Sequence, residues 1–318
     1  EHTQGNNIPK ILAMVTKRSK GLRHGYITDA EETSRSIKEA ILEAEKISGT
    51  KIEYAYAGIG GISLESTIAD GSVAISKADM EVTDLDIKRV SEASEANLKK
   101  SINRHILQTV PIQYKIDGKK SLGKPQGMRG ETLEVKTLFI TCLDQHLQLL
   151  VSAIESAGVM IEDIIASPIA ASFVTLSRVQ KTAGFVLVNI GAETVSIAVF
   201  EDGIPISLKV FSIGATDITN DIALGLKIPL EEAEQIKTRK KDNEYSKKKL
   251  EDIINARLYD IFDLVESHLK KIGKNGLLPA GAIIVGGGSN ISMIDYLAKT
   301  SLNLPARASS IPVVFGDD

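Results

Sequence analysis

The chain has 318 residues, of which 43% are hydrophobic and 25% charged, and its formal net charge is −3. This length and composition predict a globular protein of about two domains. The small negative charge gives no reason to expect nucleic acid as a partner, because phosphate binding usually rests on clustered positive charge. No stretch approaches the roughly 20 apolar residues of a membrane-spanning helix. The single cysteine, Cys142, cannot form an internal disulfide, so a reducing cytoplasmic setting is expected.

The first half of the chain reads as an α/β domain with a module inserted into it. Apolar residues at helical spacing predict a helix over residues 29–48, which Gly49 ends, and a strand over 52–57 follows. The module is expected to contain a strand at 73–75, a helix from Thr83 or Asp84 to about Lys100, and alternating strands at 110–118 and 133–141. A helix at 144–157, a strand at 161–166 and a helix from Pro168 then resume the larger domain.

The second half repeats this alternation of strands and helices. Strands are expected at 185–188, 195–200 and 206–211, and helices at 217–224 and from Pro229. Residues 237–249 hold seven Lys or Arg against two acids, and a solvated loop is the favoured reading of this run over a partner-binding patch. A long amphipathic helix, from Leu250 to about Ile272, is expected to face a protein core.

Two glycine-centred turns about ninety residues apart indicate a nucleotide cleft. In the first, the apolar strands at 185–188 and 195–200 meet at a tight turn around Gly191, whose backbone N–H groups could face a phosphate. In the second, an apolar strand ends in Gly286, Gly287 and Gly288, where no side chain keeps a flat ring away. Each turn alone is weak evidence for a ligand site, because short glycine motifs also occur in ordinary hairpins and loops.

Several short sequence motifs, in order along the chain, resemble those of the FtsA family. Its members are actin-like bacterial cell-division proteins of the actin, Hsp70 and sugar-kinase superfamily. The longest motifs are SKGLRHG at 19–25, GMRGETLE at 127–134 and LPAGAIIVGGG at 278–288. The others are GIGG at 58–61, NRHIL at 103–107, SPIA at 167–170, TNDIA at 219–223 and AEQIK at 233–237. The resemblance covers nearly the whole chain and implies an α/β, actin-like two-domain fold with an inserted strand-helix-strand-strand subdomain.

The resemblance also implies boundaries for the subdomains. Residues 1–63 and 134–180 would form subdomain 1A, without its first phosphate hairpin, and residues 64–133 the inserted subdomain 1C, the SHS2 domain. Residues 181–224 and 276–318 would form subdomain 2A. Residues 225–275 would form a reduced subdomain 2B, because about a dozen polar residues replace a strand-bearing stretch of the family.

By the same resemblance, ATP and Mg²⁺ are the expected cofactors, bound in the cleft between the domains. Residues 189–194 would be the second phosphate loop, 286–289 the adenosine loop, and Glu234 and Lys237 would reach the ribose from one helix face; a plain surface ion pair is the alternative for those two. The expected cofactor-binding residues are Asn189, Gly191, Ala192, Thr194, Gly214, Glu234, Lys237, Gly286, Gly287, Gly288 and Ser289. No catalytic or metal-ligating residue is expected, since the five histidines show no metal-site spacing.

Three departures from the family bear on hydrolysis. The first phosphate loop has no counterpart in residues 1–18, which indicates either a fragment of a longer protein or a chain that has lost hydrolysis. Asn189 replaces the usual Asp, and an amide cannot supply the carboxylate that holds a Mg²⁺ water shell or orients attacking water. Glu193 places an anion where a phosphate would approach; it could deter ATP if it points into the cleft. At most, a weak ATPase is expected.

The leading function is therefore a cell-division adaptor of the FtsA type, cytoplasmic and peripheral to the inner face of the cell membrane at the division site. Its implied partners are the FtsZ C-terminal tail, further copies of itself in filaments, and other division proteins through the inserted subdomain. Membrane contact would be made only through a C-terminal helix that this sequence does not include. The alternatives left open are an ATPase or kinase of the same superfamily, a pilus-assembly actin-like protein, and a scaffold that works without nucleotide.

Overall fold

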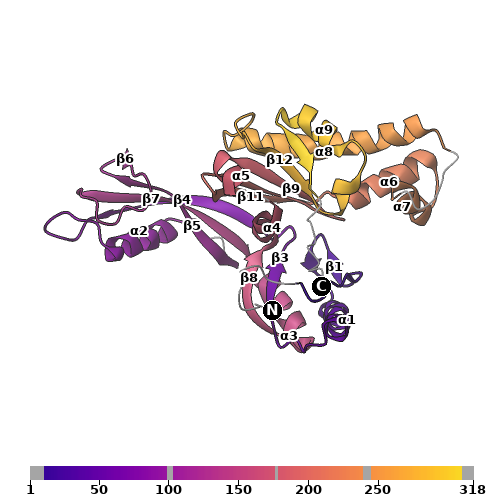
Figure 1. Cartoon of the computed structure of the whole chain (residues 1–318), viewed down its shortest axis with the longest axis horizontal. Coiled ribbons are helices and arrows are strands. Elements are labelled where there is room, and N and C mark those ends of the chain that lie inside the picture. The colour runs from indigo at the N-terminus through magenta and orange to yellow at the C-terminus, as the bar shows by residue number, and fades with distance from the viewer. Residues whose placement is uncertain (1–10, 99–102, 176–177, 239–244, 310–318) are drawn as a thin grey trace.

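The structure is a computed structural model that describes residues 11–98, 103–175, 178–238 and 245–309. It consists of an arm, on the left of Figure 1, and an upper and a lower lobe on the right. The arm comprises residues 64–98 and 103–143, the lower lobe residues 11–63 and 144–175, and the upper lobe residues 178–238 and 245–309. The inserted module therefore projects away from the two lobes.

The arm is the predicted strand-helix-strand-strand unit, with longer strands than expected. Its elements are β4 (Glu65–Ala74), α2 (Asp84–Ala96), β5 (Arg104–Ile116), β6 (Lys119–Lys120) and β7 (Thr132–Leu143). β7 pairs antiparallel with both β4 and β5. α2 lies close to β4 at Gly71, where a Cβ atom would be 2.3 Å from the carbonyl oxygen of Val90. The helix can approach the sheet this closely only because Gly71 has no side chain.

The strands of the arm continue the sheet of the upper lobe. The strand order is β13 (Ala306–Ala308), β12 (Gly281–Val285), β9 (Phe185–Ile190), β10 (Val195–Glu201), β11 (Ile204–Phe211), β4, β7, β5 and β6. At the junction, Lys209 of β11 pairs with Glu65 of β4, and the Ser66 hydroxyl donates to the Leu208 carbonyl at 2.9 Å and accepts from the Leu208 amide at 2.8 Å. A side chain thus completes the hydrogen bonding where the two parts of the sheet meet.

The upper lobe is a mixed sheet with helices packed on it. Its strands are β9 (Phe185–Ile190), β10 (Val195–Glu201), β11 (Ile204–Phe211), β12 (Gly281–Val285) and β13 (Ala306–Ala308). Its helices are α5 (Arg178–Ala183), α6 (Ala215–Leu226), α7 (Leu230–Lys237), α8 (Lys247–Lys271), η1 (Gly287–Asn290) and α9 (Ile294–Leu302). Successive residues of β9 face opposite sides of the sheet. Val186 and Val188 join the core with α6, α8 and α9, whereas Phe185 and Leu187 join the core shared with the arm and lower lobe.

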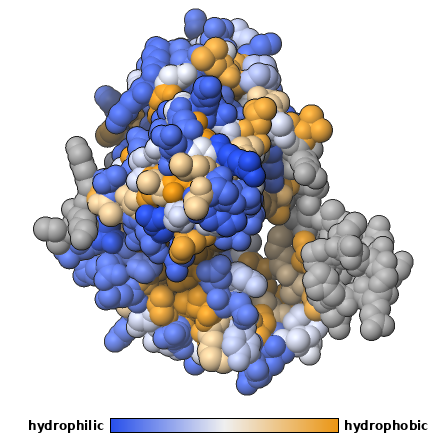
Figure 2. Space-filling view, turned by 90° about the vertical axis from the view of Figure 1, so that its left-hand side faces the viewer, coloured by the Kyte–Doolittle hydropathy of each residue, from blue (hydrophilic) through white to orange (hydrophobic). Residues whose placement is uncertain are grey.

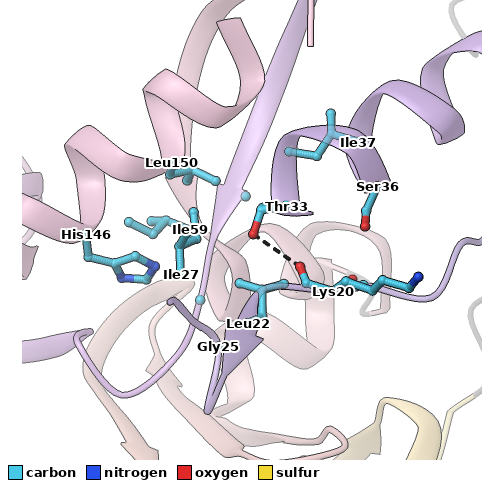
Figure 3. Close-up of a pocket in the computed structure, with 13 residues that line it drawn as sticks. Lys20, Leu22, Gly25, Ile27, Thr33, Ser36, Ile37, Ile59, His146 and Leu150 are labelled. Carbon is cyan, nitrogen blue, oxygen red and sulfur yellow. Dashed lines mark hydrogen bonds between the residues drawn. The ribbon is translucent and has the colours of Figure 1, made fainter. Parts of the chain in front are cut away.

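The lower lobe packs α1 (Ala30–Ser48) and α3 (Asp144–Ser156) on the parallel pair β3 (Tyr54–Ile59) and β8 (Met160–Ala166). β1 (Leu22–Arg23) and β2 (Tyr26–Ile27) form a short hairpin beside it, and α4 (Ser167–Thr175) leads to the upper lobe. Figure 3 shows a cavity of about 270 Å³ among the hairpin, α1, β3 and α3. His146 forms part of its wall, and its Nδ1 lies 2.5 Å from the Ser63 hydroxyl. Burial lowers the pKa of His146.

The surface carries both polar and apolar regions. Figure 2, which looks at the arm end-on, shows hydrophilic residues over most of the upper face and hydrophobic residues gathered in the lower half. Among the described residues, no helix has the length and apolar character needed to cross a bilayer.

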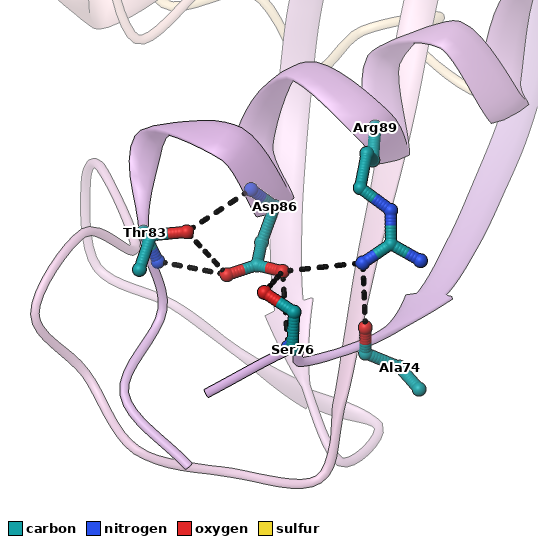
Figure 4. Close-up of polar contacts among 5 residues, drawn as sticks. All are labelled: Ala74, Ser76, Thr83, Asp86 and Arg89. Atoms are coloured by element: carbon teal, nitrogen blue, oxygen red, sulfur yellow. Dashed lines mark hydrogen bonds and ion pairs between the residues drawn. The ribbon is translucent and has the colours of Figure 1, made fainter. Parts of the chain in front are cut away.

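A buried carboxylate organises the start of α2 (Figure 4). Burial raises the pKa of Asp86, but hydrogen bonds from the amides and hydroxyls of Thr83 and Ser76 outweigh it and bring the pKa to about 2. The hydroxyls lie 2.6 Å and 2.8 Å from the carboxylate oxygens. The Thr83 hydroxyl also accepts from the Asp86 amide, which completes a capping box. The predicted start at Thr83 or Asp84 is confirmed, although the helix ends at Ala96; residues 99–102 lie outside the described residues.

Replacing Asp86 by asparagine is expected to lower the free energy of unfolding by about 2 kcal/mol, since it weakens several charge-assisted bonds in a buried site. The carboxylate contribution is full above the unfolded pKa and is lost as the pH falls toward the folded value of about 2. Urea denaturation at pH 7 measures the effect. Asp84→Asn, on the exposed face of the same helical turn, is the control and is expected to cost less than about 1 kcal/mol. Equal losses in the two variants would contradict this role of Asp86.

His268 of α8 is expected to make the stability of the upper lobe depend on pH. Burial, followed by the charges of Lys209 and Lys271, lowers the pKa of His268 to about 4, and its Nε2 lies 2.8 Å from the Ser207 hydroxyl. The folded chain therefore binds fewer protons than the unfolded chain between about pH 6.5 and 4. Stability is full above pH 6.5 and falls by at most about 1.4 kcal/mol per pH unit across this window. Urea midpoints at pH 7 and pH 5 should differ less in His268→Gln than in the unchanged chain; the same difference in both would refute the prediction.

Candidate nucleotide-binding site

The candidate site lies where the parallel strands β9 and β12 end. Val285 at the end of β12 pairs with Asn189 near the end of β9, so the Gly286–Ser289 segment and the turn after Ile190 leave the sheet side by side. The carboxyl ends of parallel strands are the usual position of ligands in open α/β sheets. The two glycine turns, far apart in the sequence, therefore lie next to each other at one edge of the upper lobe.

The adenosine-loop candidate is tightly folded and free of bulky side chains. Gly286 has a φ of 86°, and a Cβ atom there would lie 2.3 Å from the Asn189 Oδ1 and 2.6 Å from the Ile190 carbonyl oxygen. The Ser289 hydroxyl and amide both donate to the Gly286 carbonyl, at 2.7 Å and 3.0 Å. Gly287 is exposed, and a Cβ atom there would have no neighbour within 4 Å. The loop thus presents open backbone surface beside Asn189.

The phosphate-loop candidate is held by the first turn of α6. Within the turn, the Gly191 amide donates to the Thr194 carbonyl at 2.9 Å. The amides of Ala215 and Thr216 donate to the carbonyls of Gly191 and Ala192, at 2.9 Å and 2.7 Å. In a planar trans peptide the C=O and the following N–H point in opposite directions. The amides of Ala192 and Glu193 therefore point away from α6, as an anion-binding turn requires.

Gly214 makes the contact between α6 and this turn possible. A Cβ atom at Gly214 would lie 2.4 Å from the Ala192 carbonyl oxygen, so a larger residue would push the helix from the loop. The Gly214 amide donates to the Asp217 carboxylate at 2.7 Å, which satisfies the amide that precedes the helix. The backbone at Gly214 is extended, so its lack of a side chain, rather than an unusual dihedral angle, is what the position needs.

Glu234 and Lys237 lie on one face of α7, as their spacing predicts, and they contact α6. The Lys237 Nζ lies 2.7 Å from the Glu234 carboxylate, 2.7 Å from the Thr219 hydroxyl and 2.9 Å from the Ala215 carbonyl. The Lys237 side chain is only 9% exposed, whereas that of Glu234 is 50% exposed. Ala215 in turn donates to Gly191, so this ion pair is connected to the phosphate-loop candidate. The lysine end of the pair is nearly buried and fixes α7 to the start of α6, while the glutamate end is exposed.

Glu193 points toward the lower lobe. Its Oε2 accepts a hydrogen bond from the His24 amide at 2.5 Å, and its carbonyl lies 3.1 Å from the His24 Nδ1. The carboxylate therefore lies across the junction between the lobes, at the turn of the β1–β2 hairpin. Sequence reasoning missed His24, which entered only as part of a family motif. The signal that was present is a His-Gly pair in a tight turn next to a basic residue, Arg23.

A series of contacts connects the predicted cofactor-binding residues. Asn189 lies beside Gly286, Gly191 and Ala192 accept hydrogen bonds from the first turn of α6, and Lys237 contacts Ala215 of that turn. Thr194 is connected through its carbonyl, which accepts from the Gly191 amide. Two predictions fall partly outside the described residues. These are the missing first phosphate loop, which concerns residues 1–18, and the basic run, which includes residues 239–244.

The part of the chain that the structure describes has no group of three or more His, Cys, Asp or Glu side chains placed to hold a metal ion. Asn189 offers only an amide oxygen, and the Glu193 carboxylate accepts a hydrogen bond from the His24 amide. Mg²⁺ commonly binds through substrate phosphates with few protein ligands. The residues present therefore fit a Mg²⁺ ion that arrives with a nucleotide better than one held by the protein alone.

Comparison with known proteins identifies two segments. A family model described as "Cell division protein FtsA" matches residues 186–313, and one described as "SHS2 domain inserted in FTSA" matches residues 61–141. The cell division protein FtsA of Pseudomonas aeruginosa is 31% identical over an alignment 320 positions long, gaps included, which covers 94% of this chain and 76% of that protein. FtsA of Bacillus subtilis is 30% identical, over 94% of this chain and 73% of that protein.

Solved structures share the fold at lower identity. A PilM-PilN type IV pilus biogenesis complex matches with a TM-score of 0.68 and 18% identity over 96% of this chain and 83% of that chain. The ethanolamine utilization protein EutJ of Carboxydothermus hydrogenoformans matches with a TM-score of 0.55 and 16% identity over 94% of this chain and 76% of that chain. The predicted actin-like α/β fold with an inserted SHS2 subdomain is thereby confirmed.

Proposed function

The chain belongs to the FtsA family of bacterial cell-division proteins, and from this membership we propose that it is a nucleotide-binding adaptor of the division machinery. The observation that carries the proposal is the similarity to FtsA over 94% of the chain, which includes both the arm and the upper lobe. The pilus-assembly alternative is not favoured, since its support is a likeness of fold at 18% identity.

ATP is the proposed ligand of the candidate site. The adenosine would lie on Gly286–Ser289, where Gly287 leaves open space, and the phosphates would face the amides of Ala192 and Glu193. Glu234 is half exposed and is the member of the α7 pair that can reach a ribose hydroxyl, while Lys237 positions it. Mg²⁺ would enter with the phosphates and neutralise part of their charge.

Nucleotide binding is proposed to matter more than hydrolysis. Asn189 stands at the end of β9, where its amide cannot accept a proton from water. A true ATPase or kinase would need a carboxylate that orients the attacking group, and neither Asn189 nor the His24-bound Glu193 supplies one. The chain is therefore proposed to be at most a weak ATPase, in which the ligand changes the relative orientation of the lobes.

The proposed partners follow from the family. The chain would bind the C-terminal tail of FtsZ, associate with further copies of itself into filaments, and contact other division proteins through the arm. Its proposed location is the inner face of the cell membrane at the division site.

Binding of the FtsZ tail tests the proposal. A fluorescein-labelled peptide of the FtsZ C-terminal tail from the same organism is titrated with the full chain, and fluorescence anisotropy is measured. A dissociation constant in the micromolar range is expected, as for many transient protein contacts. A scrambled peptide of the same composition is the control. Equal binding of the two peptides, or binding of neither, would contradict the adaptor function.

A further inference from the structure

A pair of contacts between His24 and Glu193 joins the phosphate-loop candidate to the lower lobe. The His24 amide donates to the Glu193 Oε2 at 2.5 Å, and the His24 ring lies 3.1 Å from the Glu193 carbonyl through Nδ1. Because a carbonyl oxygen only accepts, the Nδ1 carries the proton in this contact. Two donors of one residue thus hold one residue of the opposite lobe, 169 positions away in the chain.

His24 and Gly25 are the two turn residues of the β1–β2 hairpin. His24 has a φ of 49° and Gly25 a φ of 70°, so both lie in the left-handed region that a two-residue type I′ turn requires. Here the amide of Ile62 donates to the His24 carbonyl at 3.2 Å, and Gly25 lies against Gly61. The lower lobe therefore fixes the direction of the His24 amide.

The atom that occupies this amide is an anionic oxygen. A carboxylate oxygen and a phosphate oxygen accept the same kind of hydrogen bond from a backbone amide. Glu193 also belongs to the turn whose amides at Ala192 and Glu193 face away from α6. The His24 amide and the phosphate-loop candidate thus meet at the Glu193 side chain.

We infer that the His24 amide is a binding site for a phosphate oxygen of the nucleotide, and that the Glu193 carboxylate competes for it. The inference rests on the proposed nucleotide function and assigns its regulation. A nucleotide that reaches this site must displace Glu193, because two anionic oxygens cannot share one donor without repulsion. Displacement also breaks the contact between the lobes, so that nucleotide binding changes how the upper lobe is held on the lower lobe.

Two measurements on the full chain test the inference, with Glu193→Ala as the variant. Asp202→Asn is the control, because Asp202 is an exposed acid in the turn between β10 and β11 and asparagine tolerates its positive φ of 52°. Hydrogen exchange without nucleotide measures the exchange rate of the His24 amide. This rate should be higher in Glu193→Ala than in the unchanged chain, and the same in Asp202→Asn as in the unchanged chain. Equilibrium dialysis with ATP and Mg²⁺ should give about tenfold tighter binding in Glu193→Ala than in the unchanged chain, as expected from removal of one repulsive charge.

The outcomes separate this inference from the proposed function. Faster exchange together with tighter ATP binding supports both. ATP that binds the unchanged chain and Glu193→Ala equally well, or binds the variant more weakly, overturns the competition and leaves the proposed nucleotide binding standing. Absence of ATP binding in both chains overturns the proposed nucleotide binding and the inference with it. Unchanged exchange of His24 in Glu193→Ala refutes the contact itself, whatever the affinity for ATP.

Discussion

Replacing Gly286 by valine should abolish ATP binding and lower the free energy of unfolding by about 3 kcal/mol. The added Cβ atom would lie 2.3 Å from the Asn189 Oδ1 and 2.6 Å from the Ile190 carbonyl oxygen. The Asn189 side chain can move, but the Ile190 backbone is part of β9 and cannot. Valine is also strongly disfavoured at a φ of 86°. Urea denaturation and ATP titration of the purified chain measure the two effects.

Gly287→Ala is the matched control for this substitution. A Cβ atom at Gly287 would have no neighbour within 4 Å. Gly287→Ala should therefore change the free energy of unfolding by less than about 0.5 kcal/mol. If Gly286→Val proved as stable as Gly287→Ala, the close packing of the glycine loop on the end of β9 would be wrong.

Replacing Lys237 by methionine should lower the free energy of unfolding by about 3 kcal/mol, although methionine keeps most of the unbranched apolar stem of the side chain. The ammonium group is nearly buried and contacts Glu234, Thr219 and the Ala215 carbonyl. Methionine leaves these polar groups without their cationic partner and loosens α7 from α6. Thermal or urea denaturation gives the loss, and ATP titration should show weaker binding because α6 holds the phosphate-loop candidate.

Lys270→Met provides the comparison for Lys237. Lys270 pairs with Glu266 at 2.8 Å on the surface of α8, and its side chain is 57% exposed. An exposed pair of this kind contributes roughly 0.5 kcal/mol, because water screens the charges. Similar losses for Lys237→Met and Lys270→Met would mean that the buried position of Lys237 has no energetic importance.

Helices with local start and stop signals could be predicted from the sequence. Asp29 caps α1 by accepting from the Glu32 amide, and Gly49 ends it in the left-handed conformation with a φ of 68°. Both signals depend only on residues within one helical turn. The helix expected over residues 29–48 is therefore confirmed to within a residue at its start.

Strands were predicted less completely, because their extent depends on distant partners. β4 was expected only at residues 73–75, but it runs over Glu65–Ala74, since β7 pairs with it along this whole length. Asp70 and Gly71 are poor strand formers by themselves. The pairing with β7 and the close approach of α2 at Gly71 override that local preference.

In the candidate site, too, the local motifs could be predicted from the sequence, whereas the contacts between distant elements could not. The turn at Gly191 and the glycines at 286–288 were recognisable as separate motifs, and pairing of β9 with β12 brings them to one edge of the sheet. The spacing of Glu234 and Lys237 predicted a shared helix face, but burial of Lys237 depends on Thr219 of another helix. The contact of Glu193 with His24 spans the two lobes, and no local pattern predicts such a contact.

Equilibrium binding of ATP with Mg²⁺, measured by titration calorimetry, tests the central claim most directly. The unchanged chain is compared with Gly287→Phe, which places a ring in the open space of the adenosine-loop candidate while leaving the packed glycines in place. A dissociation constant in the micromolar range for the unchanged chain, with binding at least tenfold weaker in Gly287→Phe, is the predicted result. No binding to the unchanged chain, or equal binding to both, would contradict a nucleotide site at the ends of β9 and β12.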